Sequence, residues 1–166
     1  MSSVSPASPA NLPQSPAVPE PGRASDAGVS VGIVLVSHSR ALAEAAVDLA
    51  RRLIVAVDVP VELAAGLADG GLGTDPGAVV EAVERLAERC EGVLVLADLG
   101  SGIMSAEMAL EMLDPALAER TRLSAAPFVE GLLGAYGAAG IGKDLQAVAA
   151  EADGAAEAKR SQVAAF

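Results

Sequence analysis

The chain has 166 residues and a mass of 16.4 kDa, a size that indicates one domain or two at most. Apolar residues make up 52% and aromatic residues only 2%, so Ala, Val, Leu and Ile must form the core, which argues against an aromatic-stacking nucleic-acid module. The net charge of −11 argues against a nucleic-acid partner, while one Cys and one His exclude a disulfide scaffold, a Cys-based metal site and a multi-histidine metal site.

The first 28 residues differ in composition from the rest of the chain. They hold six of the ten prolines and several serines, which favours extended, solvated conformations that cannot bury a core. We predict a disordered tail over residues 1–28 and one folded domain over residues 29–166. The tail lacks the features of a secretory signal, and no apolar run is long enough to span a bilayer. We therefore expect a cytoplasmic protein with no membrane partner.

From Val29 onward, apolar β-branched runs alternate with segments of helical spacing. The pattern predicts strands over 29–36, 61–65, 92–97 and 121–125, and helices over 40–53, from 76 onward, and over 103–113, 129–139 and 144–164. Such alternation is typical of βαβ units with right-handed crossovers. The predicted fold class is α/β, a mostly parallel open sheet with helices on both faces.

Three loops that follow predicted strands carry the candidate chemistry. They are the segments 37–39, the Gly-rich 70–75 and 98–101. In an open parallel sheet, ligands bind at the carboxyl ends of the strands where the strand order reverses. If strands 29–36 and 92–97 are neighbours at that point, His38 and Asp98 emerge side by side, each before a helix N-terminus.

His38 is the centre of the predicted site. A lone histidine can be merely structural, but this one directly follows a buried strand and opens a helix. Asp98 could accept a hydrogen bond from one ring nitrogen and fix the tautomer, which leaves the other nitrogen as a nucleophile. Backbone N–H groups at the helix starts could bind phosphoryl oxygens. This predicts a phosphohistidine site and no hydrolase, because no second base is evident to activate water.

Four segments in register resemble a known family. They are VLVSHS (34–39), GLGTD (71–75), ADLGS (97–101) followed by EMALEML (107–113), and APFVEG (126–131). They resemble the phosphotransfer subunits of phosphoenolpyruvate-dependent dihydroxyacetone kinase, the DhaM family, whose domain is similar to the mannose-type EIIA domain of the sugar phosphotransferase system (PTS). The resemblance covers about residues 30–162.

The resemblance implies a role for each residue of the site. His38 would take a phosphoryl group at its tele nitrogen, Nε2, from the phosphocarrier HPr, and Asp98 would orient the ring. The positions that would line the phosphoryl pocket are Ser39, Thr74, Gly100 and Ser101. No metal and no cofactor is implied beyond the transient phosphohistidine.

The resemblance also implies partners and an overall reaction. From His38 the phosphoryl group would pass to ADP on a partner kinase subunit (DhaL), whose ATP phosphorylates dihydroxyacetone (glycerone) on a third subunit (DhaK). The chain would thus be a component of a phosphoenolpyruvate–glycerone phosphotransferase. Family members are homodimers. Longer relatives carry HPr-like and enzyme-I-like domains, whereas this sequence ends at Phe166, so we expect it to depend on separate HPr and enzyme I.

Two other functions stay open. A mannose-type sugar-transport IIA domain would share His38 and Asp98 but pass its phosphate to a IIB protein; segments 98–101 and 126–131 favour the kinase. A regulatory relative could bind the kinase subunits without carrying phosphate, although the intact pair of His38 and Asp98 argues against this.

Three further features have plainer interpretations. The segment Gly137–Lys143 imitates a Walker A loop, but Asp144 stands where Ser or Thr should hold magnesium, so we predict a helix C-cap. Met104, Met108 and Met112 recur at helical spacing and predict packing in the core or between subunits. Arg40 could assist phosphoryl transfer or be a solvated residue of the first helical turn.

Overall fold

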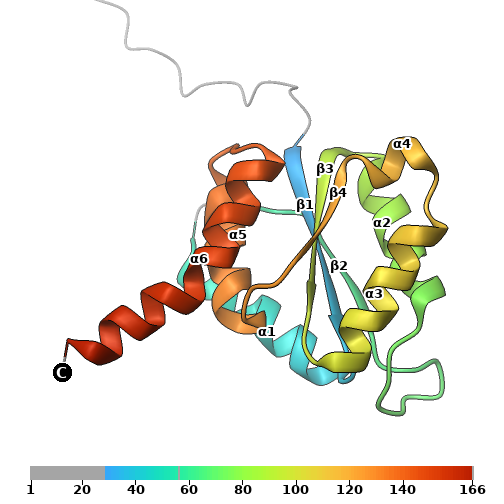
Figure 1. The fold of residues 1–166 in the computed structure, drawn as a ribbon, viewed down its shortest axis with the longest axis horizontal. Helices are drawn as coiled ribbons and strands as arrows, with labels where there is room; N and C mark the ends of the chain where they lie inside the picture. The colour runs from blue at the N-terminus through green and yellow to red at the C-terminus, as the bar shows by residue number, and fades with distance from the viewer. Residues whose placement is uncertain (1–28, 56, 166) are drawn as a thin grey trace, which may run out of the picture.

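The strands form one four-stranded parallel sheet in the order β2-β1-β3-β4 (Figure 1). The computed structural model describes residues 29–55 and 57–165, so the tail predicted over 1–28 lies outside the described residues. The elements are β1 (Val29–Ser37), α1 (Arg40–Leu53), β2 (Val61–Ala65), α2 (Pro76–Ala87), β3 (Cys90–Ala97), α3 (Gly100–Met112), α4 (Pro115–Ala118), β4 (Thr121–Ser124), α5 (Phe128–Gly140) and α6 (Leu145–Ala164).

The two most apolar strands, β1 and β3, lie side by side in the centre of the sheet. Their register pairs Val36 with Ala97, so both strands end at the same level. The strand order reverses between them, because β2 follows β1 on one side and β4 follows β3 on the other. This is the switch point that the sequence predicted, and parallel sheets place their ligand sites there.

Helices cover both faces of the sheet, as predicted. One face packs Val31, Ile33 and Leu35 against α1, α5 and α6, and the other packs Val34 and Val36 against α2 and α3. Alternate residues of β1 thus enter opposite cores, as the two-residue period of a strand requires. In Figure 1, α1, α5 and α6 stand on one side of the strands, and α2 and α3 stand on the other.

Most predicted bounds lie within one or two residues of the structure, and the larger differences concern two helices. Helix α3 begins at Gly100, three residues before the predicted start at residue 103. The sequence does not signal this start, because the N-cap Leu99 has no capping side chain and two of the first three residues are glycines with low helix propensity. The short helix α4 was not predicted. Asp114 caps it, with Pro115 in its first turn.

The methionines of α3 correct one prediction. Met104, Met108 and Met112 are 62%, 53% and 60% exposed, so packing in the core is wrong for all three. They lie on the outer face because Ala106 and Ala109 occupy the inner face of the helix. Their packing between subunits stays a prediction.

The Walker-like segment closes a helix. Gly142 has a φ of +78°, follows the end of α5, and donates its N–H to the carbonyl of Ala139, while Lys143 donates to that of Ala138. The predicted C-cap is therefore confirmed. Over the described residues, no helix combines the length and apolarity needed to cross a bilayer.

Candidate functional site

His38 and Asp98 meet at the switch point of the sheet. His38 lies between the end of β1 and the start of α1, and Asp98 directly follows β3. One carboxylate oxygen of Asp98, Oδ1, lies 2.9 Å from Nδ1 of the ring, while Oδ2 accepts the backbone N–H of His38 at 2.9 Å. The carboxylate therefore holds both the backbone and the side chain of His38.

This contact fixes which ring nitrogen is free. An ionised carboxylate can only accept hydrogen bonds, so Nδ1 must donate and the neutral ring carries its proton there. The lone pair is then on Nε2. The side chain of His38 is 27% exposed and that of Asp98 is 6% exposed, so the buried acid aims a ring that another molecule can reach.

Hydrogen bonds keep Asp98 ionised. Burial by itself raises the pKa of Asp98, but the backbone N–H and ring of His38, the hydroxyl of Ser37 and the N–H of Leu99 outweigh it and lower the pKa below its ordinary value of 3.8. All of these groups donate to the charged form. Asp98 thus acts as a fixed anion near neutral pH.

Ser101 contacts the free nitrogen of the ring. Its hydroxyl oxygen lies 2.5 Å from Nε2, and in this tautomer the hydroxyl donates the hydrogen bond. Ser101 lies in the first turn of α3, whose N-terminus has no side-chain cap. The first N–H groups of this helix, including those of Gly100 and Ser101, are therefore placed to bind an anion beside Nε2.

The Gly-rich loop between β2 and α2 closes the other side of the site. The N–H of Gly73 donates to the carbonyl of His38 at 2.9 Å. The hydroxyl of Thr74 lies 2.8 Å from that of Ser105 and 3.4 Å from the carbonyl of Ser101, so Thr74 ties the loop to the start of α3. Thr74 therefore lies beside the site, and its role in phosphoryl binding stays a prediction.

Ser39 and Arg40 are already engaged within α1. The hydroxyl of Ser39 caps this helix by accepting the N–H of Leu42 at 3.2 Å. The guanidinium of Arg40 pairs with Glu44 at 3.0 Å and its side chain is 62% exposed. Neither contact tests a role in phosphoryl binding, which stays a prediction for Ser39.

Three residues of the site were not predicted from the sequence. Ser37 is fully buried and bonds Asp98, and Ser105 is the buried partner of Thr74. At Gly102, a Cβ atom would lie 2.8 Å from Oδ1 of Asp98, so only glycine fits there without displacing the carboxylate. A hydroxyl at the end of an apolar strand was the available signal for Ser37, whereas Gly102 and Ser105 lie within α3.

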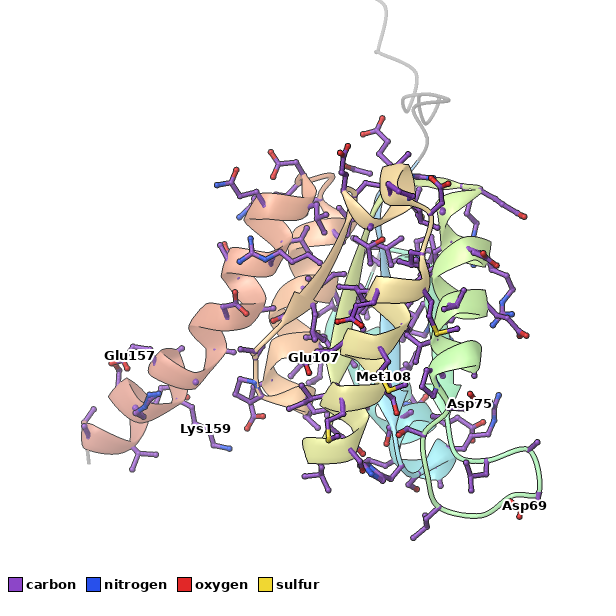
Figure 2. All side chains as sticks on the ribbon, turned by 45° about the vertical axis from the view of Figure 1, so that its right-hand side comes forward. Asp69, Asp75, Glu107, Met108, Glu157 and Lys159 are labelled. Atoms are coloured by element: carbon purple, nitrogen blue, oxygen red, sulfur yellow. The ribbon has the colours of Figure 1, made fainter. Side chains whose placement is uncertain are left out.

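Acidic side chains lie on the elements around the site (Figure 2), and a cleft opens on one side of it. Asp69 and Asp75 lie on the loop before α2, and Glu107 lies on α3 (Figure 2). A cleft of about 540 Å³ opens beside Asp98 between α3 and the segment that joins β4 to α5. Over the described residues, no three His, Cys, Asp or Glu side chains gather as a metal site would require.

The chain belongs to the EIIA-man family, described as the PTS system fructose IIA component, which matches residues 32–149. The crystal structure of the unknown-function protein EF1359 has the same fold: its TM-score is 0.68 and its identity 31%, with 75% of this chain and 93% of that chain covered. The mannose-type EIIA-like α/β fold predicted from the sequence is thus confirmed.

Within this family, the chain is similar to DhaM proteins. It is 44% identical over 135 residues to the "PEP-dependent dihydroxyacetone kinase, phosphoryl donor subunit DhaM" of Klebsiella michiganensis and to that of Escherichia coli strain K12. Each match covers 80% of this chain and 28% of the relative. The chain therefore spans about 28% of the length of these curated relatives. A DhaM of Listeria innocua is 37% identical over 101 residues, 61% of this chain and 79% of that relative. The resemblance to the DhaM family is confirmed.

Proposed function

We propose that the chain is a phosphoryl carrier that accepts a phosphoryl group on Nε2 of His38 and passes it to another protein. One observation carries the proposal. Asp98 holds Nδ1 of the only histidine at 2.9 Å, while Nε2 faces the uncapped N-terminus of α3. A nucleophile, an orienting acid and an anion-binding helix end are thus together at one edge of the sheet.

The chemistry needs no proton transfer and no water. The Ser101 hydroxyl first turns away from Nε2. The lone pair of Nε2 then forms the new N–P bond as the N–P bond of a donor phosphohistidine breaks, and the electron pair of that bond returns to the donor ring. The proton on Nδ1 stays in place, and Asp98 stabilises the positive charge that develops on the ring.

Neutral donors would hold the phosphoryl group. The N–H groups of Gly100 and Ser101 and the hydroxyls of Ser101 and Thr74 are the nearest candidates. The nearby cation, Arg40, is paired with Glu44. A site without a strong fixed cation binds phosphate weakly, so the group stays transferable, and positioning supplies most of the rate.

We propose HPr as the donor and ADP on a partner kinase subunit as the acceptor, for the phosphorylation of dihydroxyacetone. The names of the DhaM relatives, phosphoryl donor subunits of PEP-dependent dihydroxyacetone kinases, support a role in that kinase, while HPr and ADP are what the family resemblance implies. We also propose that the chain works as a homodimer, as the resemblance implies. The alternative, transfer to a IIB protein in sugar transport, is supported by the family description as a PTS fructose IIA component.

Phosphorylation in a reconstituted system tests the carrier role. Tag-free protein is incubated with phosphoenolpyruvate, enzyme I and HPr, and the adduct is followed by mass spectrometry. We expect one phosphoryl group, labile to acid and stable to base, which His38→Ala lacks. Absence of this adduct in the unmodified chain, or its persistence in His38→Ala, would reject the proposal.

The choice between acceptors needs a second step. The purified phosphorylated protein is mixed either with the ADP-bearing kinase subunit or with a IIB protein. Discharge with formation of ATP supports the kinase, and discharge to the IIB protein alone supports the transporter.

A further inference from the structure

Ser37 is a buried hydroxyl residue at the end of β1. It is 0% exposed, pairs with Ala65 of β2, and its carbonyl accepts the N–H of Gly66. A hydroxyl in such a place needs hydrogen-bond partners within the protein. The partners that it has belong to the site around His38.

The hydroxyl of Ser37 joins Asp98 to the turn that carries His38. Its Oγ lies 2.9 Å from Oδ2 of Asp98 and accepts the N–H of Ser39 at 3.1 Å. The carbonyl of Ser39 also lies 3.1 Å away, but the hydroxyl has one proton, and the ionised carboxylate is the stronger acceptor at the shorter distance. The proton therefore goes to Asp98.

We infer that Ser37 is a positioning residue for phosphoryl transfer, which holds the Asp98 carboxylate in the orientation that aims Oδ1 at Nδ1 of His38. The inference rests on the function proposed for His38 and adds the group that fixes its orienting acid. Ser37 acts through Asp98 and not on the phosphoryl group.

The reason lies in how the two oxygens of Asp98 are used. Oδ2 accepts the hydroxyl of Ser37 and the N–H of His38, which leaves Oδ1 for the ring and for the N–H of Leu99. Without the hydroxyl, Oδ2 keeps one of its two donors and the carboxylate can rotate. The ring then loses its fixed acceptor, so its proton can move to Nε2, where it blocks the nucleophile.

The single histidine makes this directly measurable. Because the sequence contains one His, the imidazole ¹⁵N resonances of tag-free protein report His38 alone. Spectra are recorded at increasing pH until the resonances no longer move, and they then give the populations of the two tautomers. The variant is Ser37→Ala, and Ser37→Cys is a second variant that keeps the shape with a weaker donor.

Ser124 provides a matched control. It ends β4 as Ser37 ends β1, is 7% exposed, donates to Asp153 at 2.5 Å and accepts the N–H of Ala126 at 3.1 Å. Ser124→Ala therefore removes the same kind of serine–aspartate bond at another strand end. Circular dichroism and thermal melts show how far each substitution affects the fold.

We expect the unmodified protein to hold the Nδ1–H tautomer. In Ser37→Ala the Nε2–H form appears and phosphoryl uptake from phospho-HPr slows about tenfold, whereas Ser124→Ala keeps the original tautomer and rate. Unchanged tautomers in both Ser37 variants, or an equal change in Ser124→Ala, would overturn the inference. If the unmodified chain takes up no phosphoryl group, the proposed function fails, but the tautomers of the unphosphorylated protein still decide the role of Ser37.

Discussion

Four hydrogen bonds meet on the carboxylate of Asp98, and they decide what the neighbouring ring can do. The donors are two backbone N–H groups, one hydroxyl and Nδ1 of His38. Bonds to an ionised acceptor are stronger than bonds between neutral groups. The chemistry of Nε2 therefore depends on a residue that contacts only the other nitrogen.

Replacement of Asp98 by asparagine should slow transfer while the protein stays folded. The amide nitrogen cannot accept, so the side chain loses one acceptor and its charge. We expect a fall in the rate of phosphoryl uptake of about 10- to 100-fold. Rapid-quench measurement with phospho-HPr gives the rate. Asp114→Asn at the N-cap of α4, where either residue caps well, should keep the original rate. Equal rates in Asp98→Asn and the unmodified protein would contradict the orienting role.

Gly102→Ala should separate activity from stability. The new Cβ would lie 2.8 Å from Oδ1 of Asp98 and push the carboxylate away from His38. Alanine is the better helix former, which limits the loss of stability. We expect transfer to fall about 100-fold, because small misplacements of reacting groups have large effects on rate. The control is Gly154→Ala, where a Cβ meets nothing within 4 Å; there, activity should be unchanged. Full activity in Gly102→Ala would show that the carboxylate can shift without consequence.

The sequence predicted the central pair of this site but not its supports. His38 and Asp98 each follow a strongly apolar strand, so local pattern and the switch-point rule were enough to bring them together. Ser37 and Gly102 matter through contacts with Asp98, which lies far from Ser37 in the sequence. Such roles depend on side-chain packing, which a single sequence does not reveal.

At the level of elements, the close packing of α5 on α6 follows from small residues. At Gly134 of α5, a Cβ atom would lie 2.8 Å from the backbone carbonyl oxygen of Glu151 in α6. Three buried residues of α6, Val148, Ala149 and Ala152, enter the same core as α5. The two helices can approach this closely because one of them has no side chain at the contact.

Gly134→Ala should therefore destabilise the protein although alanine favours a helix. The carbonyl oxygen is backbone, so a whole helix must move to accommodate the methyl group. We expect a loss of about 1–3 kcal/mol in the free energy of unfolding, the usual effect of overpacking. Urea denaturation measures it, with Gly154→Ala in the same helix pair as the reference that should gain about 0.5–1 kcal/mol. A gain of stability in both variants would contradict the packing.

The elements were easier to predict than their ends. Buried β-branched runs and helical spacing gave every strand and all helices except α4, since these signals extend over many residues. The start of α3 was missed by three residues because Leu99 carries no capping group. That missing cap made the boundary hard to predict, and it also leaves N–H groups beside His38, which under the proposed function bind the phosphoryl group.

For the whole molecule, carboxyl groups whose pKa is lowered in the folded state make the free energy of unfolding depend on pH. Burial raises the pKa of Asp98, but the hydrogen bonds to its carboxylate outweigh burial and lower the pKa. At Glu130, the hydrogen bond from Lys159 is the main cause that lowers the pKa. A carboxyl group whose pKa is lower in the folded state stabilises the fold above its unfolded pKa. This contribution is lost as the pH falls through the folded value.

We expect the urea midpoint to fall as the pH drops below about 4.5, near the ordinary values of these groups. Protonation also reduces the repulsion within the net charge of −11, and this effect stabilises the fold as the pH falls. The measurements are therefore made at one high salt concentration, which screens the repulsion. Lys159→Met should make the fall shallower, because it removes the partner of Glu130. A midpoint that rises steadily toward pH 3 would contradict the assignment.

The one ring nitrogen of His38 that Asp98 does not contact also constrains the kinetics of the proposed transfer. Asp98 occupies Nδ1, so under the proposed function Nε2 carries the group, and we expect that a second protein cannot reach it while the first is docked. Under the proposed function, donor and acceptor must alternate on the same surface, and an excess of either will inhibit the other. Steady-state rates at several fixed acceptor concentrations should then give parallel reciprocal plots, the signature of a ping-pong cycle.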